Sequence, residues 1–229
     1  MITRDVALVV PACYPDIFGA FVESLEEHKE RWPFAKKILV RDEEEIVPPA
    51  GWEVVQGPSP YVMPRNVNLG LNAAGRMDVV MATDDTQFTD RGGLQELRRA
   101  AYLDWRVAIV SPQIDGGCSI VDQRAGVVYH GISRSLSSFD MSRIAFIFIY
   151  VKRGIIDLIG GWDEQFTTYG HDDFDYCERT IRVDKRIVVT PEVVIKHGYH
   201  APSMNTYSRK GTADTAEGAR IFNEKWGTH

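Results

Sequence analysis

The feature of this sequence that most constrains its fold is a series of short, uninterrupted apolar runs separated by stretches with helical spacing. The first run, VALVV at 6–10, stops at Pro11. Because every position of such a run is apolar, it indicates a strand that is buried on both faces, as in a parallel sheet. Further strand-like segments follow at 37–41, 52–55, 78–83, 107–110, 143–150 and 187–195.

The segments between these runs carry apolar residues at helical spacing. Helices are expected at about 16–32, 64–74, 90–103, 172–183 and 212–226, with Asp90 capping the third. Residues 113–142 contain several glycines and serines and indicate a loop with a hairpin. Strands that alternate with helices predict an α/β fold, in which a mostly parallel central sheet is flanked by helices in a single Rossmann-like domain spanning 1–229.

Composition excludes several classes of protein. Lys and Arg number 26 against 32 Asp and Glu, so the net charge of −6 argues against a strong electrostatic grip on duplex nucleic acid, although a local basic groove is still allowed. The odd number of cysteines, without a C-x-x-C pair, argues against a disulfide framework or a zinc site. The longest apolar run, 144–151, is far shorter than the ~20 residues that span a bilayer, and the N-terminus lacks signal-peptide features. We therefore expect a cytoplasmic protein.

Carboxylates gather in the segment 160–179, which also contains several aromatic residues. Five of them fall within thirteen residues: Asp163, Glu164, Asp172, Asp173 and Asp175. Acids in the first turn of a helix are favoured by the helix dipole, which is one interpretation. The other is a set of carboxylates at the rim of a pocket, with one member acting as a general base. The segment by itself leaves both open.

Acids also stand where predicted strands end. Asp42 closes the strand at 37–41, and Asp84 and Asp85 follow the strand at 78–83. In parallel α/β sheets, ligands bind beyond the carboxyl ends of the strands. These acids are therefore candidates for a binding site, against the alternative that they only form turns.

Three groups of motifs point to a known family. The first is an N-terminal strand with Pro11 and Ala12, followed by a second strand that ends in Asp42. Residues 66–85 (NVNLGLNAAGRMDVVMATDD) are a predicted helix leading into a strand that ends in two acids. Residues 160–179 contain GGWDEQF and then GHDDFDYCER, and VIKH follows at 194–197. In this order and separation, over about residues 6–200, they resemble the family 2 nucleotide-sugar glycosyltransferases of the GT-A fold, with the family's D-x-D motif at 83–85. Thr83 occupies the first position of that motif, which argues against ribose binding by a carboxylate there.

The resemblance implies a nucleotide-sugar-binding half at 1–110, an acceptor and catalytic half at 111–200, and a C-terminal loop and helix at 201–229. It implies that Asp85 and His197 hold Mn²⁺ or Mg²⁺, with His200 as the competing histidine. Both cations suit oxygen ligands and can bridge carboxylates to a diphosphate. The residues implied for the donor nucleotide are Pro11, Ala12, Asp42, Arg65, Asn68 and Asp84.

Catalytic roles also follow from the resemblance. It favours Asp173 as the general base of an inverting reaction, with Asp172 as the alternative. Trp162, Asp163 and Glu164 are implied to contact the acceptor or the sugar. Other roles remain open for some of these side chains, because Trp162 and Asn68 could simply pack and Arg65 could pair with an acid. Asp175 and Arg179 are four residues apart, which suits an ion pair on one helix face.

The resulting hypothesis is a metal-dependent, inverting, hexosyltransferase-like enzyme that favours a UDP-sugar, with Asp42 accepting the imide N–H of uracil or thymine. The alternatives are a retaining transferase, a sugar nucleotidyltransferase and a non-catalytic carbohydrate-binding protein. A nucleotidyltransferase would normally show a glycine-rich basic loop near the N-terminus, and residues 11–14 (PACY) do not.

The acceptor is the least determined part of the hypothesis. We expect acceptor specificity in 113–142 and 201–215. Proteins of this type also occur in bacteriophages, so a hydroxymethylated DNA base, modified in the host cytoplasm, is a second hypothesis for the acceptor. A modest basic rim for DNA would consist of Arg124, Arg134, Arg143, Arg209 and Lys210.

Overall fold

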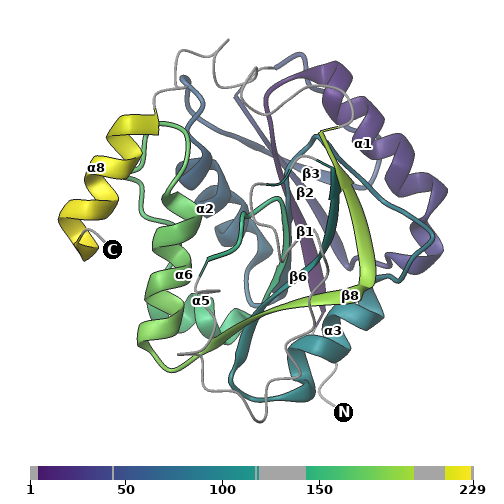
Figure 1. Cartoon of the computed structure of the whole chain (residues 1–229). Coiled ribbons are helices and arrows are strands. Elements are labelled where there is room, and N and C mark those ends of the chain that lie inside the picture. The colour runs from purple at the N-terminus through teal and green to yellow at the C-terminus, as the bar shows by residue number, and fades with distance from the viewer. Residues whose placement is uncertain (1–4, 43, 117, 119–142, 199–214, 228–229) are drawn as a thin grey trace.

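The computed structural model describes residues 5–42, 44–116, 118, 143–198 and 215–227. Their central element is an eight-stranded sheet with the order β3-β2-β1-β4-β7-β6-β8-β5, and helices cover both of its faces (Figure 1). This arrangement confirms the predicted α/β architecture. Among the described residues, no helix is both long enough and apolar enough to cross a membrane.

The strands are β1 (Val6–Ala12), β2 (Lys36–Arg41), β3 (Trp52–Gln56), β4 (Asp78–Ala82), β5 (Thr86–Gln87), β6 (Val107–Gly116), β7 (Phe148–Val151) and β8 (Arg186–His197). The helices are α1 (Pro15–Glu27), α2 (Met63–Ala74), α3 (Leu94–Leu103), α5 (Arg153–Ile159), α6 (Asp172–Arg182) and α8 (Thr215–Trp226), with a short 3₁₀ helix, η1 (Lys29–Arg31).

Most of the sheet is parallel. β3, β2, β1 and β4 run in one direction, and β6 pairs with β8 in parallel. β7 lies antiparallel between β4 and β6, and β5 pairs antiparallel with the end of β8 at the sheet edge. The carboxyl ends of β1, β2 and β4 therefore lie at one edge of the sheet, where the chain leaves each strand.

Burial on both faces explains the uninterrupted apolar run of β1. Leu8 and Val10 pack in the cluster that includes α1 and α3, whereas Ala7 and Val9 pack in the cluster that includes α2, α5 and α6. Figure 1 shows the same division, with α1 and α3 on one face and α2, α5 and α6 on the other. α8 lies outside α6, so the last helix is a further layer on that face.

Several predicted elements differ in the structure. The strand expected at 107–110 continues to Gly116, into a segment expected to be a loop, and the helix expected at 16–32 ends at Glu27 before a short 3₁₀ helix. The strand expected at 143–150 forms only at Phe148–Val151, because β4 and β6 offer pairing partners to those residues alone. Asp90 does not cap α3, which begins after Gly93 and has no side-chain cap. The start of α3 is instead fixed by close backbone packing, since a Cβ on Gly93 would lie 2.5 Å from the carbonyl oxygen of Arg31. The helix α5, of seven residues, was not predicted from the sequence.

The contact between α2 and β1 provides a test of this packing. A Cβ added to Gly70 would lie 2.2 Å from Cγ1 of Val9, so Gly70→Ala should overpack the core and lower the free energy of unfolding by about 1–3 kcal/mol. Gly19→Ala in α1 is the matched control, because its Cβ would meet nothing within 4 Å. That variant should gain about 0.5–1 kcal/mol from helix propensity. Urea denaturation measures both, and a Gly70→Ala protein as stable as wild type would contradict the packing described.

Candidate active site

Four of the residues predicted to bind the donor lie at the carboxyl edge of the sheet. Pro11 and Ala12 end β1 and are buried, and Ala12 pairs with the last residue of β2, next to Asp42. Asp42 is 8% exposed. Across β1, the backbone N–H of Cys13 donates to Oδ2 of Asp84 over 3.3 Å. The topology thus gathers Pro11, Ala12, Asp42 and Asp84 although they are separated by up to 73 positions in the chain.

Arg65 lies on α2, and its side chain is engaged by the protein. Its guanidinium donates to the carbonyl oxygen of Pro58 over 2.9 Å and to that of Pro60. Arg65 therefore holds the loop that follows β3. The structure shows no carboxylate of the described residues paired with Arg65, so the alternative of an ion pair does not apply among them.

Asn68, one turn further along α2, connects the two halves of the site. Its amide nitrogen donates to the carbonyl oxygen of Trp162 over 2.9 Å and to Oε1 of Glu164 over 2.8 Å, and its amide oxygen accepts the N–H of Trp162 over 2.7 Å. A Cβ on Gly161 would lie 2.2 Å from Oδ1 of Asn68, so this close approach requires a glycine. Asn68 thus fixes the position of segment 160–164.

Asp85 and His197 meet at the pairing of β5 with β8, where Thr86 lies opposite His197. Oδ2 of Asp85 lies 3.3 Å from Nε2 of His197, and both side chains are more than 90% buried. The second carboxylate oxygen of Asp85, Oδ1, is buried and accepts no hydrogen bond from any described residue. A buried oxygen without a partner is costly, so this position suits a cation.

The donor set is compatible with a divalent metal, but it is small. Within the described ranges, no group of three or more His, Cys, Asp and Glu side chains is placed to hold a metal ion. Asp85 and His197 would provide two ligands, and Mg²⁺ and Mn²⁺ readily complete their coordination with waters and substrate phosphates. The competing histidine, His200, lies outside the described residues.

Asp84 has an unusual protonation equilibrium. Burial, and then the neighbouring negative charge of Asp85, raise the pKa of Asp84 to about 8, and the hydrogen bond from the N–H of Cys13 opposes this shift. Asp84 is consequently a proton donor over much of the neutral range. A cation bound at Asp85 would reverse this preference, because positive charge favours the carboxylate form.

Asp172 and Asp173 begin α6, immediately after His171. Burial raises the pKa of Asp172, and the charge of Asp173 raises it further. Burial also raises the pKa of Asp173, but the backbone N–H groups of Phe174 and Phe146 donate to this carboxylate and oppose the shift. The bond from Phe174 to Oδ1 is 2.8 Å long. Because of these bonds, Asp173 is the member of the pair that holds the negative charge more readily.

Asp175, two residues further along, has a structural role. It is fully buried and pairs with Arg179 over 2.8 Å, which confirms the expected ion pair along α6. Lys225 lies 2.7 Å from the other oxygen, and the indole N–H of Trp226 donates to it over 2.9 Å. Asp175 therefore anchors the end of α8 against α6.

Asp163 belongs to the same cluster of charges. Its carboxylate lies 2.7 Å from Nζ of Lys225 and also accepts the N–H of Gln165. Partial burial alone would raise the pKa of Asp163, but these hydrogen bonds and the charge of Lys225 bring it below its ordinary value. Asp163 is thus a charged group that holds α8.

Trp162 is 3% exposed and lies flat against Tyr176, with ring centroids 3.9 Å apart. Phe146 packs edge-on against the same indole, at a centroid distance of 5.4 Å. One face of Trp162 is therefore covered by the core. The remaining part of the side chain borders the cavity described next.

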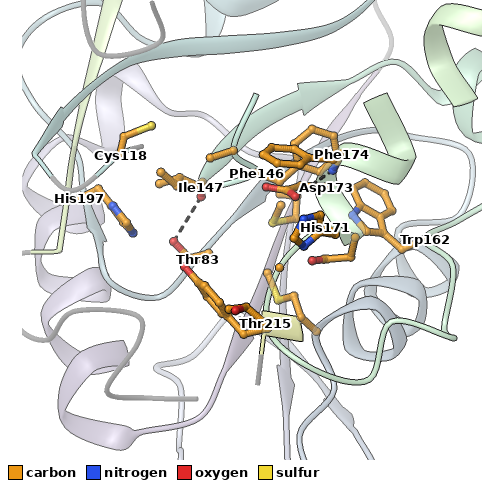
Figure 2. A pocket seen from close by; sticks show the side chains of 16 residues that line it. Thr83, Cys118, Phe146, Ile147, Trp162, His171, Asp173, Phe174, His197 and Thr215 are labelled. Atoms are coloured by element: carbon orange, nitrogen blue, oxygen red, sulfur yellow. Dashed lines mark hydrogen bonds between the residues drawn. The ribbon is translucent and has the colours of Figure 1, made fainter. Parts of the chain in front are cut away.

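One cavity of about 320 Å³ unites residues from both halves of the chain. His197 and Thr83 lie on one side, and Asp173 and Trp162 on the other (Figure 2). This volume is within the usual range for small-ligand sites. The described side chains that line it are Met63, Met81, Thr83, Cys118, Ala145, Phe146, Ile147, Trp162, Tyr169, Gly170, His171, Asp172, Asp173, Phe174, His197 and Thr215.

The apolar residues that line this cavity were not predicted from the sequence. Phe146 and Ile147 lie in an apolar run that indicates a strand, and Met63 and Met81 follow ordinary helix and strand patterns. The linear pattern gives no signal for them. Of the basic rim expected for DNA, only Arg143 lies within the described residues, where its guanidinium stacks on Phe174 and Phe222.

The raised pKa of Asp84 predicts a pH-dependent stability. Between its ordinary pKa of 3.8 and about 8, the folded protein retains a proton that the unfolded chain releases. Raising the pH from 4 to 8 in the presence of EDTA should therefore lower the free energy of unfolding, by at most about 1.4 kcal/mol per pH unit for this group. Asp84→Asn should make the slope shallower, and the control Asp90→Asn, at an exposed carboxylate, should not. Urea denaturation across this pH range measures the free energy of unfolding. If it fell equally steeply with pH for Asp84→Asn and wild type, Asp84 would not have the raised pKa.

Comparisons with known proteins agree with the fold. No protein-family model matches the sequence, and no curated protein matches it significantly. The solved mannosyltransferase PcManGT from Pyrobaculum calidifontis, in complex with GDP-Man and Mn²⁺, matches with a TM-score of 0.65 and 14% identity, over 97% of this chain and 67% of that chain. GalNAc-T7 with UDP, GalNAc and Mn²⁺ matches with a TM-score of 0.65 and 12% identity, over 96% of this chain and 50% of that chain. This chain has the GT-A fold found in such glycosyltransferases.

Proposed function

We propose that the protein is a metal-dependent, inverting glycosyltransferase that moves a sugar from a nucleoside-diphosphate sugar to an acceptor hydroxyl group. The observation that carries this proposal is the shared cavity. His197, whose imidazole lies 3.3 Å from the buried carboxylate of Asp85, lines it on one side, and the acid pair Asp172 and Asp173 lines the other. A glycosyltransferase needs a group that stabilises the departing diphosphate on one side of the reacting bond and a group that deprotonates the acceptor on the other.

The donor would occupy the edge formed by the ends of β1, β2 and β4. Asp42 would accept the imide N–H of a uracil base, and Pro11 and Ala12 would border that base, so a UDP-sugar is the favoured donor. Asp84 would hydrogen-bond the ribose or a water of the metal. The two similar solved structures contain Mn²⁺ with GDP-Man or with UDP, which supports a nucleotide and a divalent metal here. Bound Mn²⁺ or Mg²⁺ would neutralise the charge of the departing diphosphate.

The acceptor would enter beside α6. Asp173 takes the proton of the acceptor hydroxyl as the oxygen of that group attacks the anomeric carbon, and the bond to the diphosphate breaks. The charge that Phe174 and Phe146 stabilise on Asp173 suits this base. Asn68 holds the segment that carries Trp162, which lines the cavity, and Glu164 would complete the acceptor side from that segment. The carboxylate of Asp163, also predicted to contact the acceptor or the sugar, is instead engaged by Lys225.

Metal binding can be tested by thermal denaturation. UDP-glucose and GDP-mannose, each with and without Mn²⁺, serve as donors, and a ligand at a hundred times its Kd should stabilise the protein by about 2.7 kcal/mol. Stabilisation should require Mn²⁺, and Asp85→Asn and His197→Gln should each remove most of it. The control Asp90→Asn should respond as wild type does. Full Mn²⁺-dependent stabilisation of the Asp85→Asn protein would refute this metal site.

The base can be tested by transfer assays with a panel of sugar acceptors. Asp173→Asn should lower kcat by about 10²–10⁴, the usual contribution of a general base, and leave stabilisation by donor and Mn²⁺ unchanged. Asp172→Asn should have the smaller effect. If Asp172→Asn is the inactive variant and Asp173→Asn retains its activity, the assignment is reversed. The anomeric configuration of the product, read by NMR, separates an inverting from a retaining reaction.

A further inference from the structure

His171 has a backbone conformation that is uncommon for its residue type. Its φ of 72° and ψ of −12° place it in the left-handed region, directly before α6. Side chains with a Cβ are disfavoured there, although histidine is among the residues that adopt it more often. Strained residues persist where the surrounding structure enforces them, and they cluster at functional sites. This conformation directs the imidazole to the wall that also carries Asp172 and Asp173.

The imidazole makes aromatic contacts but, within the part of the chain that the structure describes, no hydrogen bond. Its ring centroid lies 5.6 Å from that of Phe174 and 5.9 Å from that of Phe222 on α8. The Nδ1 atom is buried and has no hydrogen-bond partner among the described residues. Two aromatic contacts thus hold the ring.

α8 decides which nitrogen a ligand can reach. A Cβ on Gly218 would lie 3.5 Å from Nδ1 of His171 and 2.5 Å from the carbonyl oxygen of Gly170. The helix therefore covers the Nδ1 side of the ring. His171 lines the cavity (Figure 2), so we expect a molecule there to reach the ring at its other nitrogen, Nε2.

The charge state of the ring suits a sugar hydroxyl. Partial burial and, secondarily, the charge of Arg143 lower the pKa of His171, so the imidazole is neutral near pH 7. A neutral imidazole donates or accepts at Nε2 according to its tautomer, and a hydroxyl group can match either role. A neutral ring also places no positive charge beside the proposed base, Asp173.

We infer that His171 is an acceptor-binding residue, whose Nε2 hydrogen-bonds a second hydroxyl group of the acceptor beside the one that reacts at Asp173. This inference rests on the proposed glycosyltransferase function. Two polar groups from neighbouring positions of one wall match two neighbouring hydroxyl groups of a pyranose ring. The apolar wall at Phe146 and Phe174 suits the C–H face of such a ring. The acceptor class is therefore a carbohydrate with a vicinal diol at the site of transfer.

The test compares His171→Asn and His171→Gly with wild type. Both replacements tolerate the left-handed backbone, so either one can report if the other folds poorly. The matched control is Asp184→Asn, at the other non-glycine residue with positive φ among those described, in the turn after α6. Donors are UDP-glucose and GDP-mannose with Mn²⁺, and acceptors are p-nitrophenyl pyranosides and their deoxy analogues.

The expected result is a rise in acceptor KM of about fivefold to tenfold for both His171 variants, as for the loss of one neutral hydrogen bond. Stabilisation by donor and Mn²⁺ should not change, and Asp184→Asn should behave as wild type. Removing the hydroxyl next to the reacting one should weaken wild-type transfer by a similar factor, and should have no further effect in the variants. If His171 had a purely structural role, the variants would still transfer sugar to the deoxy analogue less well than to the full acceptor.

Two results would overturn the inference. If both His171 variants keep the wild-type acceptor KM and the wild-type sensitivity to deoxygenation, His171 does not bind the acceptor, and the proposed function stands. If wild type transfers no sugar from either donor to any acceptor or to water, the proposed function fails, and this inference fails with it.

Discussion

The geometry of the site depends on the ion pairs and hydrogen bonds of one buried carboxylate, that of Asp175. Its pair with Arg179 places that guanidinium where it also donates to the carbonyl oxygens of Ile159 and Gly161, each over 2.9 Å. Its second oxygen holds Lys225 and Trp226 at the end of α8. Removing one partner of such a buried network leaves an uncompensated charge, which typically costs 3–5 kcal/mol. One carboxylate therefore fixes α6, the glycine pair before Trp162 and α8 relative to one another.

Hydrogen-bond satisfaction separates structural acids from candidate functional ones. Asp78, fully buried at the opposite end of β4, accepts the hydroxyls of Tyr102 and Tyr150, each over 2.6 Å, and the N–H of Arg153 over 2.8 Å. Asp175 is satisfied in the same way. Asp85 is different, because one of its buried oxygens has no partner among the described residues. A fully bonded acid gains nothing from a ligand, whereas an unsatisfied one is stabilised by it.

The two halves of the site come together through tertiary contacts. Asn68 connects α2 to the segment that carries Trp162, and the short pairing of β5 with β8 brings His197 to Asp85. Each contact spans more than 90 positions of the chain. These links bring Thr83 and His197 to the same cavity as Asp172 and Asp173.

The sequence by itself determined the α/β class, most strand and helix positions and the acids at the strand ends, because burial periodicity and strand-end chemistry are local properties of the chain. It also predicted a catalytic role for Asp172 and Asp173, through the motif that surrounds them. It could not determine that strand pairing begins only at Phe148, that Gly93 rather than Asp90 starts α3, or that α8 covers His171. Those outcomes depend on which backbones and rings lie nearby in space. Only the tertiary structure decided them. A distant segment can supply a hydrogen-bond partner or a steric limit, and such a contact does not alter the pattern of apolar and polar residues in the segment that it constrains.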